Sequence, residues 1–175
     1  MKIAYTGTIF FNQKYGGISR YFTELVKRID ANAKIVAPLS KNIYLNNINK
    51  DKKFSFSLSR LPQYNFLKEI NSYLSEKVIQ GFRPDIVHET YYSEKIKDYK
   101  KFKKIISVYD LIHEKYNNKF YEKKDTKKQK IIDHADHFIC ISEQTKKDLI
   151  DFYKISEEKV SVVYLGGDHL KNNLI

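Results

Sequence analysis

Short apolar segments alternate with helical patterns along almost the whole chain, and this alternation limits the fold more than any other feature of the sequence. Each short segment is apolar along its length rather than at every second residue, as in parallel strands that are buried on both faces. The longer segments between them repeat apolar residues at helical spacing. The pattern predicts an open, doubly wound α/β domain with a mostly parallel sheet and helices on both faces.

About six parallel strands are expected, because right-handed crossovers leave few other topologies for such an alternation. Candidate strands cover residues 2–6, 33–37, 85–88, 105–109, 137–141 and 160–164, and Pro38 is expected to end the second one. Expected helices cover residues 18–29, 63–82, 118–136 and 142–153. In the second of these, Leu67, Ile70, Leu74 and Val78 mark one apolar face. Residues 54–58 alternate apolar and polar side chains, which leaves a strand and a hairpin arm as open alternatives.

The length of 175 residues allows one ordinary domain, taken as residues 1–175, and is too short for two of typical size. An activity that needs a cleft between two domains must therefore obtain its second half elsewhere. No apolar run reaches the ~18 residues of a membrane-spanning helix, and the first residues do not form a secretory signal, so a cytoplasmic location is expected. The lone Cys140 lies in an apolar run and is expected to act as a small hydrophobic residue.

The net charge of +11 comes almost entirely from lysine, with 28 lysines and four arginines. This ratio argues against nucleic acid as a partner, because base and phosphate recognition favours the planar arginine fork. Residues 95–130 hold thirteen lysines against five acidic residues. Such lysines suit diffuse attraction to an anionic membrane surface or to a lipid-linked phosphate. A solvated lysine-rich face is the alternative, and it is preferred.

Ligands of doubly wound sheets bind beyond the carboxyl ends of the strands, so the loops there form one candidate rim. The rim comprises residues 7–17, 88–93, 110–113 and 142–143. Gly16 and Gly17 directly precede a helix, where free N–H groups attract phosphate; a plain helix-entry turn is the alternative. The sequence lacks both Gly-x-Gly-x-x-Gly and the lysine-bearing P-loop. Ser142 is expected to cap the next helix, with Glu143 at its positive end.

Asp110 and His113 bring a carboxylate and an imidazole to this rim, as proton acceptor, hydroxyl orienter or charge stabiliser. The alternative is that Asp110 merely starts a loop. His88 ends a strand at the same rim. The remaining histidines lack the spacing of a zinc motif, so hydrogen-bonded structural roles are preferred and no metal is expected. These are His134, His137 and His169.

Four segments together resemble the amino-terminal domain of family four retaining glycosyltransferases, historically called group 1 transferases, which have the two-domain GT-B architecture. They read KIAYTGTIFFNQKYGGISRYFTELVKRI, RPDIVHETYY, ISVYDLIHEKY and ADHFICISEQTKKDLIDFYKISEEKVSVVYLGGD. The resemblance implies a Rossmann-like half of a GT-B enzyme that binds the acceptor, with the donor-binding second domain supplied in cis or in trans. It implies a nucleotide-sugar donor as substrate, no metal or other cofactor, and a glycan or lipid-linked acceptor in cell-surface polysaccharide or glycolipid synthesis.

For individual residues, the resemblance implies that Gly16 and Gly17 lie near the donor phosphates, with Arg20 close by. Many members carry His-Asp where this chain has Tyr109-Asp110. Asp110 is therefore carried over more firmly than Tyr109, and both join His113 as catalytic candidates. His88, Ser142 and Glu143 are candidates for donor-phosphate or acceptor binding.

Glu114 and Glu122 have the spacing of the family's Glu-x7-Glu motif, which belongs to the second domain. They follow the Asp110 loop instead of a strand of a second nucleotide-binding domain, so we interpret the spacing as coincidence. The segment YLGGD resembles the place where such enzymes cross to their second domain. A chain without that domain is expected to transfer little sugar by itself. The alternative function is a non-catalytic module that binds a glycan, a glycolipid phosphate or a nucleotide.

Overall fold

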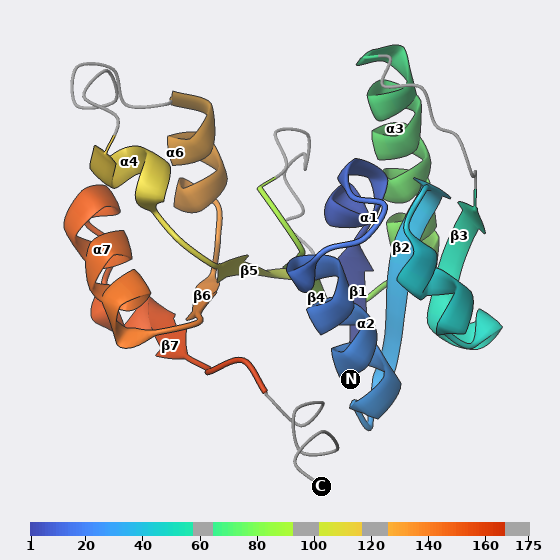
Figure 1. Cartoon of the computed structure of the whole chain (residues 1–175), viewed down its shortest axis with the longest axis horizontal. Coiled ribbons are helices and arrows are strands. Elements are labelled where there is room, and N and C mark those ends of the chain that lie inside the picture. The colour runs from blue at the N-terminus through green and yellow to red at the C-terminus, as the bar shows by residue number, and fades with distance from the viewer. Residues whose placement is uncertain (58–64, 93–101, 117–125, 167–175) are drawn as a thin grey trace, which may run out of the picture.

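The computed structural model describes residues 1–57, 65–92, 102–116 and 126–166, and these form a single seven-stranded sheet with flanking helices (Figure 1). All strands pair in parallel, in the order β3-β2-β1-β4-β5-β6-β7. The predicted doubly wound α/β fold is confirmed. The strands are β1 Lys2–Thr6, β2 Asn32–Ser40, β3 Lys53–Ser57, β4 Ile86–Glu89, β5 Lys103–Val108, β6 His137–Cys140 and β7 Val160–Val162.

The helices lie on both faces of the sheet (Figure 1). The α-helices are α1 Thr8–Asn12, α2 Gly17–Arg28, α3 Asn65–Phe82, α4 Ile112–Tyr116, α6 Thr126–Asp133 and α7 Glu143–Tyr153, and short 3-10 turns are η1 Ile43–Asn47, η2 Lys50–Lys52 and η3 Glu157–Lys159. The helix expected over 118–136 is seen as α6, and residues 117–125 lie outside the described part of the chain. The helix α1 occupies a stretch that the sequence suggested was a loop, because Ile9, Phe10 and Phe11 are buried.

The seventh strand, β3, comes from the alternating segment 54–58. It pairs in parallel with β2, so the hairpin-arm alternative is wrong. The strand β2 also passes through Pro38 and ends at Ser40, which corrects the expected stop. A register shift between Val36 and Leu39 on the β3 side accommodates the proline, whose nitrogen donates no hydrogen bond to a ladder.

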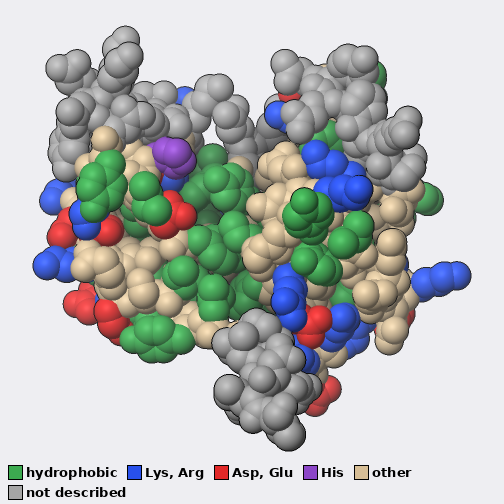
Figure 2. Space-filling view, viewed as in Figure 1, with side chains coloured by type: hydrophobic (Ala, Val, Ile, Leu, Met, Phe, Trp, Pro, Cys, Tyr) green, Lys and Arg blue, Asp and Glu red, His purple; other side chains and the backbone are tan. Residues whose placement is uncertain are grey.

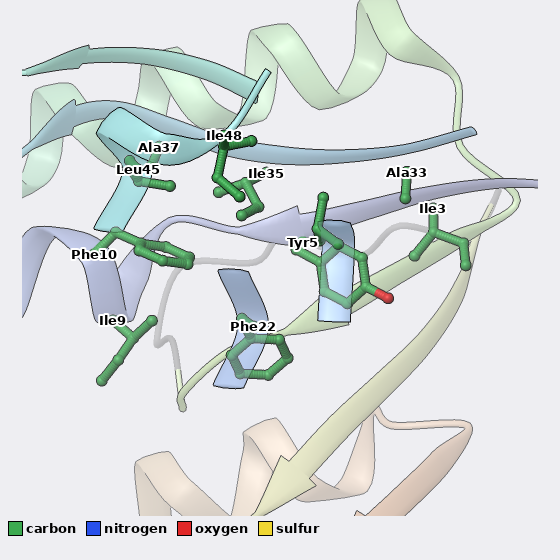
Figure 3. Close-up of a cluster of buried hydrophobic side chains, with 11 residues drawn as sticks. Ile3, Tyr5, Ile9, Phe10, Phe22, Ala33, Ile35, Ala37, Leu45 and Ile48 are labelled. Atoms are coloured by element: carbon green, nitrogen blue, oxygen red, sulfur yellow. The ribbon is translucent and has the colours of Figure 1, made fainter. Parts of the chain in front are cut away.

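One apolar core lies between α1, α2 and the sheet (Figure 3). Tyr5 of β1, Ile35 of β2 and Phe22 of α2 meet there, each at most 2% exposed. A ring pair between Tyr5 and Phe22, with centroids 5.7 Å apart, joins the helix to the first strand. Helix α2 repeats its apolar residues at the predicted helical spacing, which explains why one of its faces is buried there.

The opposite face of the sheet carries α3, α6 and α7. Ile79 of α3 packs with Val36 and Val87 of β2 and β4. A larger cluster joins the buried side chains of β5 and β6 to α6 and α7, and it contains Cys140, which is buried as expected. The burial raises the pKa of the Cys140 thiol to about 12, so the thiol stays protonated and behaves as an apolar side chain.

Within the described residues, no helix covers the α2 side of β5, β6 and β7. The register places Ile105, His137, Ile139 and Ser161 on that side, where each is at least partly exposed. Figure 2 shows hydrophobic side chains gathered in the middle of this face, between the α4 and α7 elements and the α1 and α2 elements. In this half of the sheet α6 and α7 both pack on the α3 side, so the described helices cover only that face.

Candidate functional site

Residues next to three of the predicted rim segments meet at the carboxyl ends of the strands. The rings of Tyr21 in α2 and Tyr109 after β5 meet edge to face, with centroids 6.4 Å apart. The hydroxyl of Thr145 in α7 donates to the carbonyl oxygen of Tyr109 at 3.4 Å. Tyr109 thus joins the helix that begins at Gly17 to the helix that follows Ser142, as expected for loops at one end of a parallel sheet.

The beginning of α2 presents a positive helix end to the rim. Gly16 is the N-cap, and its carbonyl accepts the first helical bond, from the N–H of Arg20 at 3.0 Å. The N–H groups of Gly17, Ile18 and Ser19 therefore have no carbonyl partner inside the helix. Gly17 and the side chain of Arg20 are exposed. Because Ser19 is fully buried, the amides that can reach a phosphate are those of Gly17 and Ile18, and the helix dipole and the Arg20 guanidinium can add to them.

Buried polar side chains hold the loop before α2 in place, and the sequence analysis missed them. The side-chain amide of Asn42 donates to the carbonyl of Gln13 at 3.0 Å, and the hydroxyl of Ser40 donates to the carbonyl of Phe10 at 3.1 Å. Both residues are only 1% exposed. They belong to no motif, and polar residues are common in loops after a strand. Only their burial in the structure shows that they hold the loop before α2.

Tyr109 lies at the centre of the rim with its hydroxyl buried. Burial raises the pKa of this phenol well above its usual range. The hydroxyl therefore stays protonated at neutral pH and can take part only as a hydrogen-bonding group. The ring packs against Tyr21, so Tyr109 fixes the geometry of the rim whether or not it touches a ligand.

Asp110 and His113 are both exposed at the same rim. One carboxylate oxygen of Asp110 accepts from the N–H of Ile112 at 3.3 Å, which is the loop-starting arrangement weighed above as the alternative. The carboxylate remains open to solvent, so this bond leaves it available to a ligand. His113 lies in the short helix α4, one turn beyond Asp110.

Ser142 caps α7 as predicted. Its hydroxyl oxygen accepts from the N–H of Thr145 at 3.1 Å, and Glu143 is exposed in the first turn of the helix. Capping occupies the Ser142 hydroxyl, whereas the Glu143 carboxylate faces solvent. Of this pair, Glu143 is the side chain with a free polar group at the rim.

His88 lies in the core beneath the rim, with 4% of the residue exposed. Its Nε2 is 2.9 Å from the hydroxyl of Ser107, and its ring packs against those of Tyr5 and Phe22 at 5.2 and 5.3 Å. Burial lowers the pKa of His88 to about 4. The imidazole is therefore neutral at physiological pH and supports the rim from below.

Acid is expected to destabilise the fold through His88. Because its folded pKa lies below that of the unfolded chain, near 6.5, the unfolded state binds the extra proton, and stability is lost as pH falls from 6.5 towards 4. The expected loss between pH 7.5 and pH 5.5 is on the order of 1 kcal/mol. Urea unfolding at both pH values measures it, and His88→Phe, which cannot titrate, is the control. An equal loss in both proteins would assign the effect to other groups.

Glu114 is held by other side chains, which agrees with the interpretation of the Glu114 and Glu122 spacing as coincidence. Its carboxylate pairs with the ammonium of Lys128 and accepts from the hydroxyl of Tyr153 at 3.0 Å, with 7% of the side chain exposed. Glu122 lies outside the described residues.

The histidines away from the rim have hydrogen-bonded positions. The Nδ1 of His134 is 2.6 Å from the carbonyl oxygen of Lys130, and the Nε2 of His137 is 2.9 Å from the hydroxyl of Ser161. His169 lies outside the described residues. In the described part of the chain, no three His, Cys, Asp or Glu side chains gather as metal ligands would.

Much of the lysine-rich segment 95–130 also lies outside the described residues, so its role at a membrane stays a prediction. No described helix has both the length and the apolar character to cross a bilayer.

Solved glycosyltransferases share this fold. The chain aligns with lipopolysaccharide outer core galactosyltransferase WaaB in its apo form at a TM-score of 0.60 and 21% identity, over 94% of this chain and 45% of that one. A glycosyltransferase from Rickettsia africae ESF-5 gives 0.60 and 18%, over 99% and 46%. Anabaena Alr3699/HepE in complex with UDP gives 0.63 and 14%, over 95% and 44%. The chain thus spans about half the length of these structures and has the fold of half a GT-B glycosyltransferase.

The sequence profile described as Glycosyltransferase Family 4 matches residues 15–169, which is most of the chain. The chain therefore belongs to glycosyltransferase family 4 and is a glycosyltransferase domain. The match includes Gly16, Asp110 and Ser142 and so covers most of the rim. A comparison with curated protein sequences finds none that matches.

Proposed function

We propose that this domain is the amino-terminal, acceptor-side half of a retaining hexosyltransferase. The enzyme would transfer a sugar from a nucleotide-sugar donor to a glycan or lipid-linked acceptor in cell-surface polysaccharide or glycolipid synthesis, on the cytoplasmic side of a membrane. The observation that carries the proposal is the rim itself. The first amides of α2 and the Asp110 carboxylate lie at one end of the sheet, in the part of the chain that matches the family.

Each rim residue has a role that follows from its chemistry. The amides after Gly16, with Arg20, would hold a donor phosphate at the positive end of α2. Asp110 would orient a substrate hydroxyl or stabilise positive charge, because its carboxylate stays open while one oxygen holds the loop. Tyr109 positions the loop that carries Asp110, through its contacts with Tyr21 and Thr145.

In the described residues no helix covers the α2 side of β5, β6 and β7, which supports a second GT-B domain in cis or in trans. Parallel sheets are normally covered on both faces, and here Ile105 and Ile139 stay partly exposed. The solved relatives are about twice as long as this chain. Part of the additional polypeptide would cover this face, and a donor-binding domain would complete the cleft beside the rim.

The test replaces Asp110 with Asn in an enzyme completed by a donor-binding domain. We expect turnover to fall about 100-fold or more, because a positioned carboxylate contributes roughly that much to such a step. The melting temperature should change little, since the Asn side-chain oxygen can still accept from the N–H of Ile112. Sugar transfer from a radiolabelled donor and thermal unfolding give the two readings.

The matched control is Asp133→Asn. This exposed carboxylate ends α6 and accepts from Gln129 at 2.7 Å. Because it directly precedes β6, it lies at the amino-terminal ends of the strands, whereas the rim lies at their carboxyl ends. Its replacement should leave turnover unchanged. Full turnover by Asp110→Asn would remove Asp110 from the reaction. The 175 residues alone should transfer little sugar in the same assay, because half of the cleft that positions the reactants would be missing.

A non-catalytic binding module is the second candidate, favoured by the positive end of α2, which can hold a phosphate group without any further chemistry. Such a module would bind a nucleotide or a glycolipid phosphate at the rim without transfer. The test supplies a donor-binding domain and measures both binding and sugar transfer. If the chain still binds the nucleotide or glycolipid phosphate but transfers sugar from no nucleotide sugar tested, the result would support the module over the transferase.

A further inference from the structure

Helix α3 exposes part of the apolar face that the sequence pattern predicted. Ile70 is 43% exposed and Leu74 37% exposed, although both belong to the predicted apolar face. Phe66 and Tyr73 lie on the same flank at helical spacing and are 58% and 60% exposed. The helix instead faces the sheet with Asn71 and Ile79. A neighbouring stripe of side chains meets the sheet, so Ile70 and Leu74 lie on an exposed flank of the predicted helix.

The edge strand β3 adds two exposed aromatic rings on the face of the sheet that carries α3. Phe54 and Phe56 are 36% and 62% exposed and form an edge-to-face pair with centroids 5.6 Å apart. Phe54 is in register with Val36, which packs against Ile79 of α3, so Phe54 lies on the α3 side of the sheet. Figure 1 shows α3 and β3 together at the same edge of the molecule.

We call these side chains the α3–β3 patch; its members are Phe54, Phe56, Phe66, Ile70, Tyr73 and Leu74. Several large apolar side chains exposed at one edge exceed the scattered exposure that is normal for a protein surface. Such a patch marks a place where another surface docks.

Charge decides between a second copy of the chain and an anionic surface. Each chain carries a net charge of +11, so two copies repel one another, whereas an anionic surface attracts the chain as a whole. Lysines border the apolar flank: Lys68 and Lys77 are exposed on α3, and the ammonium of Lys77 lies 5.5 Å from the centre of the Tyr73 ring. Their charges are balanced by Glu69 and Glu76, so the patch would be inserted by its apolar side chains while the rest of the chain supplies the attraction.

We propose that the α3–β3 patch docks on the surface of an anionic lipid bilayer and inserts its aromatic and aliphatic side chains at the headgroup level. The position of the patch suits this role. The side-chain oxygen of Asn71 accepts from the N–H of Leu39 near the carboxyl end of β2. The first half of α3 therefore lies at the same end of the strands as the rim. If the acceptor is lipid-linked, which rests on the proposed function, a docked patch would bring the rim to the membrane surface.

Vesicle binding by the 175-residue chain tests the proposal. Flotation with vesicles of phosphatidylcholine containing about one third phosphatidylglycerol should recover the chain, and vesicles of phosphatidylcholine alone should recover much less. The double variant Ile70→Ser, Tyr73→Ser should bind the anionic vesicles about tenfold more weakly or worse, because it removes two inserting side chains. The control is Ile112→Ser, Tyr116→Ser, which removes an aliphatic and an aromatic side chain that are 58% and 73% exposed on α4, far from α3 in Figure 1. It should bind like the parent chain.

Each other result overturns the proposal. Equal binding by the patch variant and the control would place the lipid contact elsewhere, for example on the lysines of 95–130. Equal recovery with both vesicle types would exclude the anionic preference. A dimer detected by light scattering that the patch variant dissolves would assign the patch to a second copy. Thermal unfolding of both variants checks that the fold persists. The assay involves no sugar transfer, so its failure leaves the proposed function untouched, and failure of the transferase test leaves the docking result standing.

Discussion

Replacing Lys104 with Met is expected to lower the free energy of unfolding by about 3–5 kcal/mol, because it removes the ammonium that faces a buried carboxylate. The ammonium of Lys104 lies 3.1 Å from Oε1 of Glu89, and the two side chains are 9% and 0% exposed. The pair joins β4 to β5 inside the sheet. Urea unfolding at pH 7, followed by circular dichroism, measures the change.

Two further variants separate the charge from the packing. In the double variant Lys104→Met, Glu89→Leu, most of the stability should return, since an apolar pair of similar size has no charge to desolvate. Lys103→Met removes the partner of Asp136, an exposed pair at 2.8 Å, and should cost less than about 1 kcal/mol. If Lys104→Met lowered the free energy of unfolding as little as Lys103→Met does, the buried Glu89 carboxylate would not need the Lys104 ammonium.

Gly7→Ala is expected to destabilise the fold by about 3 kcal/mol, at the upper end of the usual cost of overpacking. A β-carbon on Gly7 would lie 2.5 Å from the carbonyl oxygen of Val36 and 2.6 Å from the α-carbon of Ala37. Both are backbone atoms of the neighbouring strand, so relief requires movement of the sheet and not of a flexible side chain. Thermal or urea unfolding of the variant measures the loss.

The matched control is Gly81→Ala. Gly81 lies in the last turn of α3, and a β-carbon there has no atom within 4 Å. This replacement should be neutral or stabilise the fold by up to about 1 kcal/mol, because alanine favours the helix more than glycine does. If the two variants were equally stable, close backbone contact could not be the reason for glycine at position 7.

The sequence predicted the strand positions well because buried parallel strands need continuous apolar runs, and β1 lies where the pattern placed it. The misses have physical causes. Pro38 is tolerated inside β2 because a register shift lies there. The pairing of β3 with β2 joins segments distant in sequence, and no local pattern distinguishes it from a hairpin arm. The exposed flank of α3 shows what helical periodicity cannot predict: the spacing of apolar residues identifies an apolar face but not the surface that covers it.

The candidate site was predictable to the level of loops. A general property of parallel sheets placed Gly16, Asp110 and Ser142 at one end, and the structure joins their segments through Tyr109. The support beneath the rim was not predictable. The contact between His88 and Ser107, or between Asn42 and Gln13, joins residues distant in sequence, and no local pattern records such a meeting.

The two large cores share no residue, and this separation has a dynamic consequence. One core lies beneath α2 and is built from β1 and β2, whereas the other is built from β5, β6, α6 and α7 on the opposite face of the sheet. Each can loosen locally without immediate loss of the other, as independent cooperative units do. Tyr109 links the two units at the rim, because its ring packs against the first core and its carbonyl oxygen accepts from Thr145 of α7, so a ligand bound there would stabilise both halves at once.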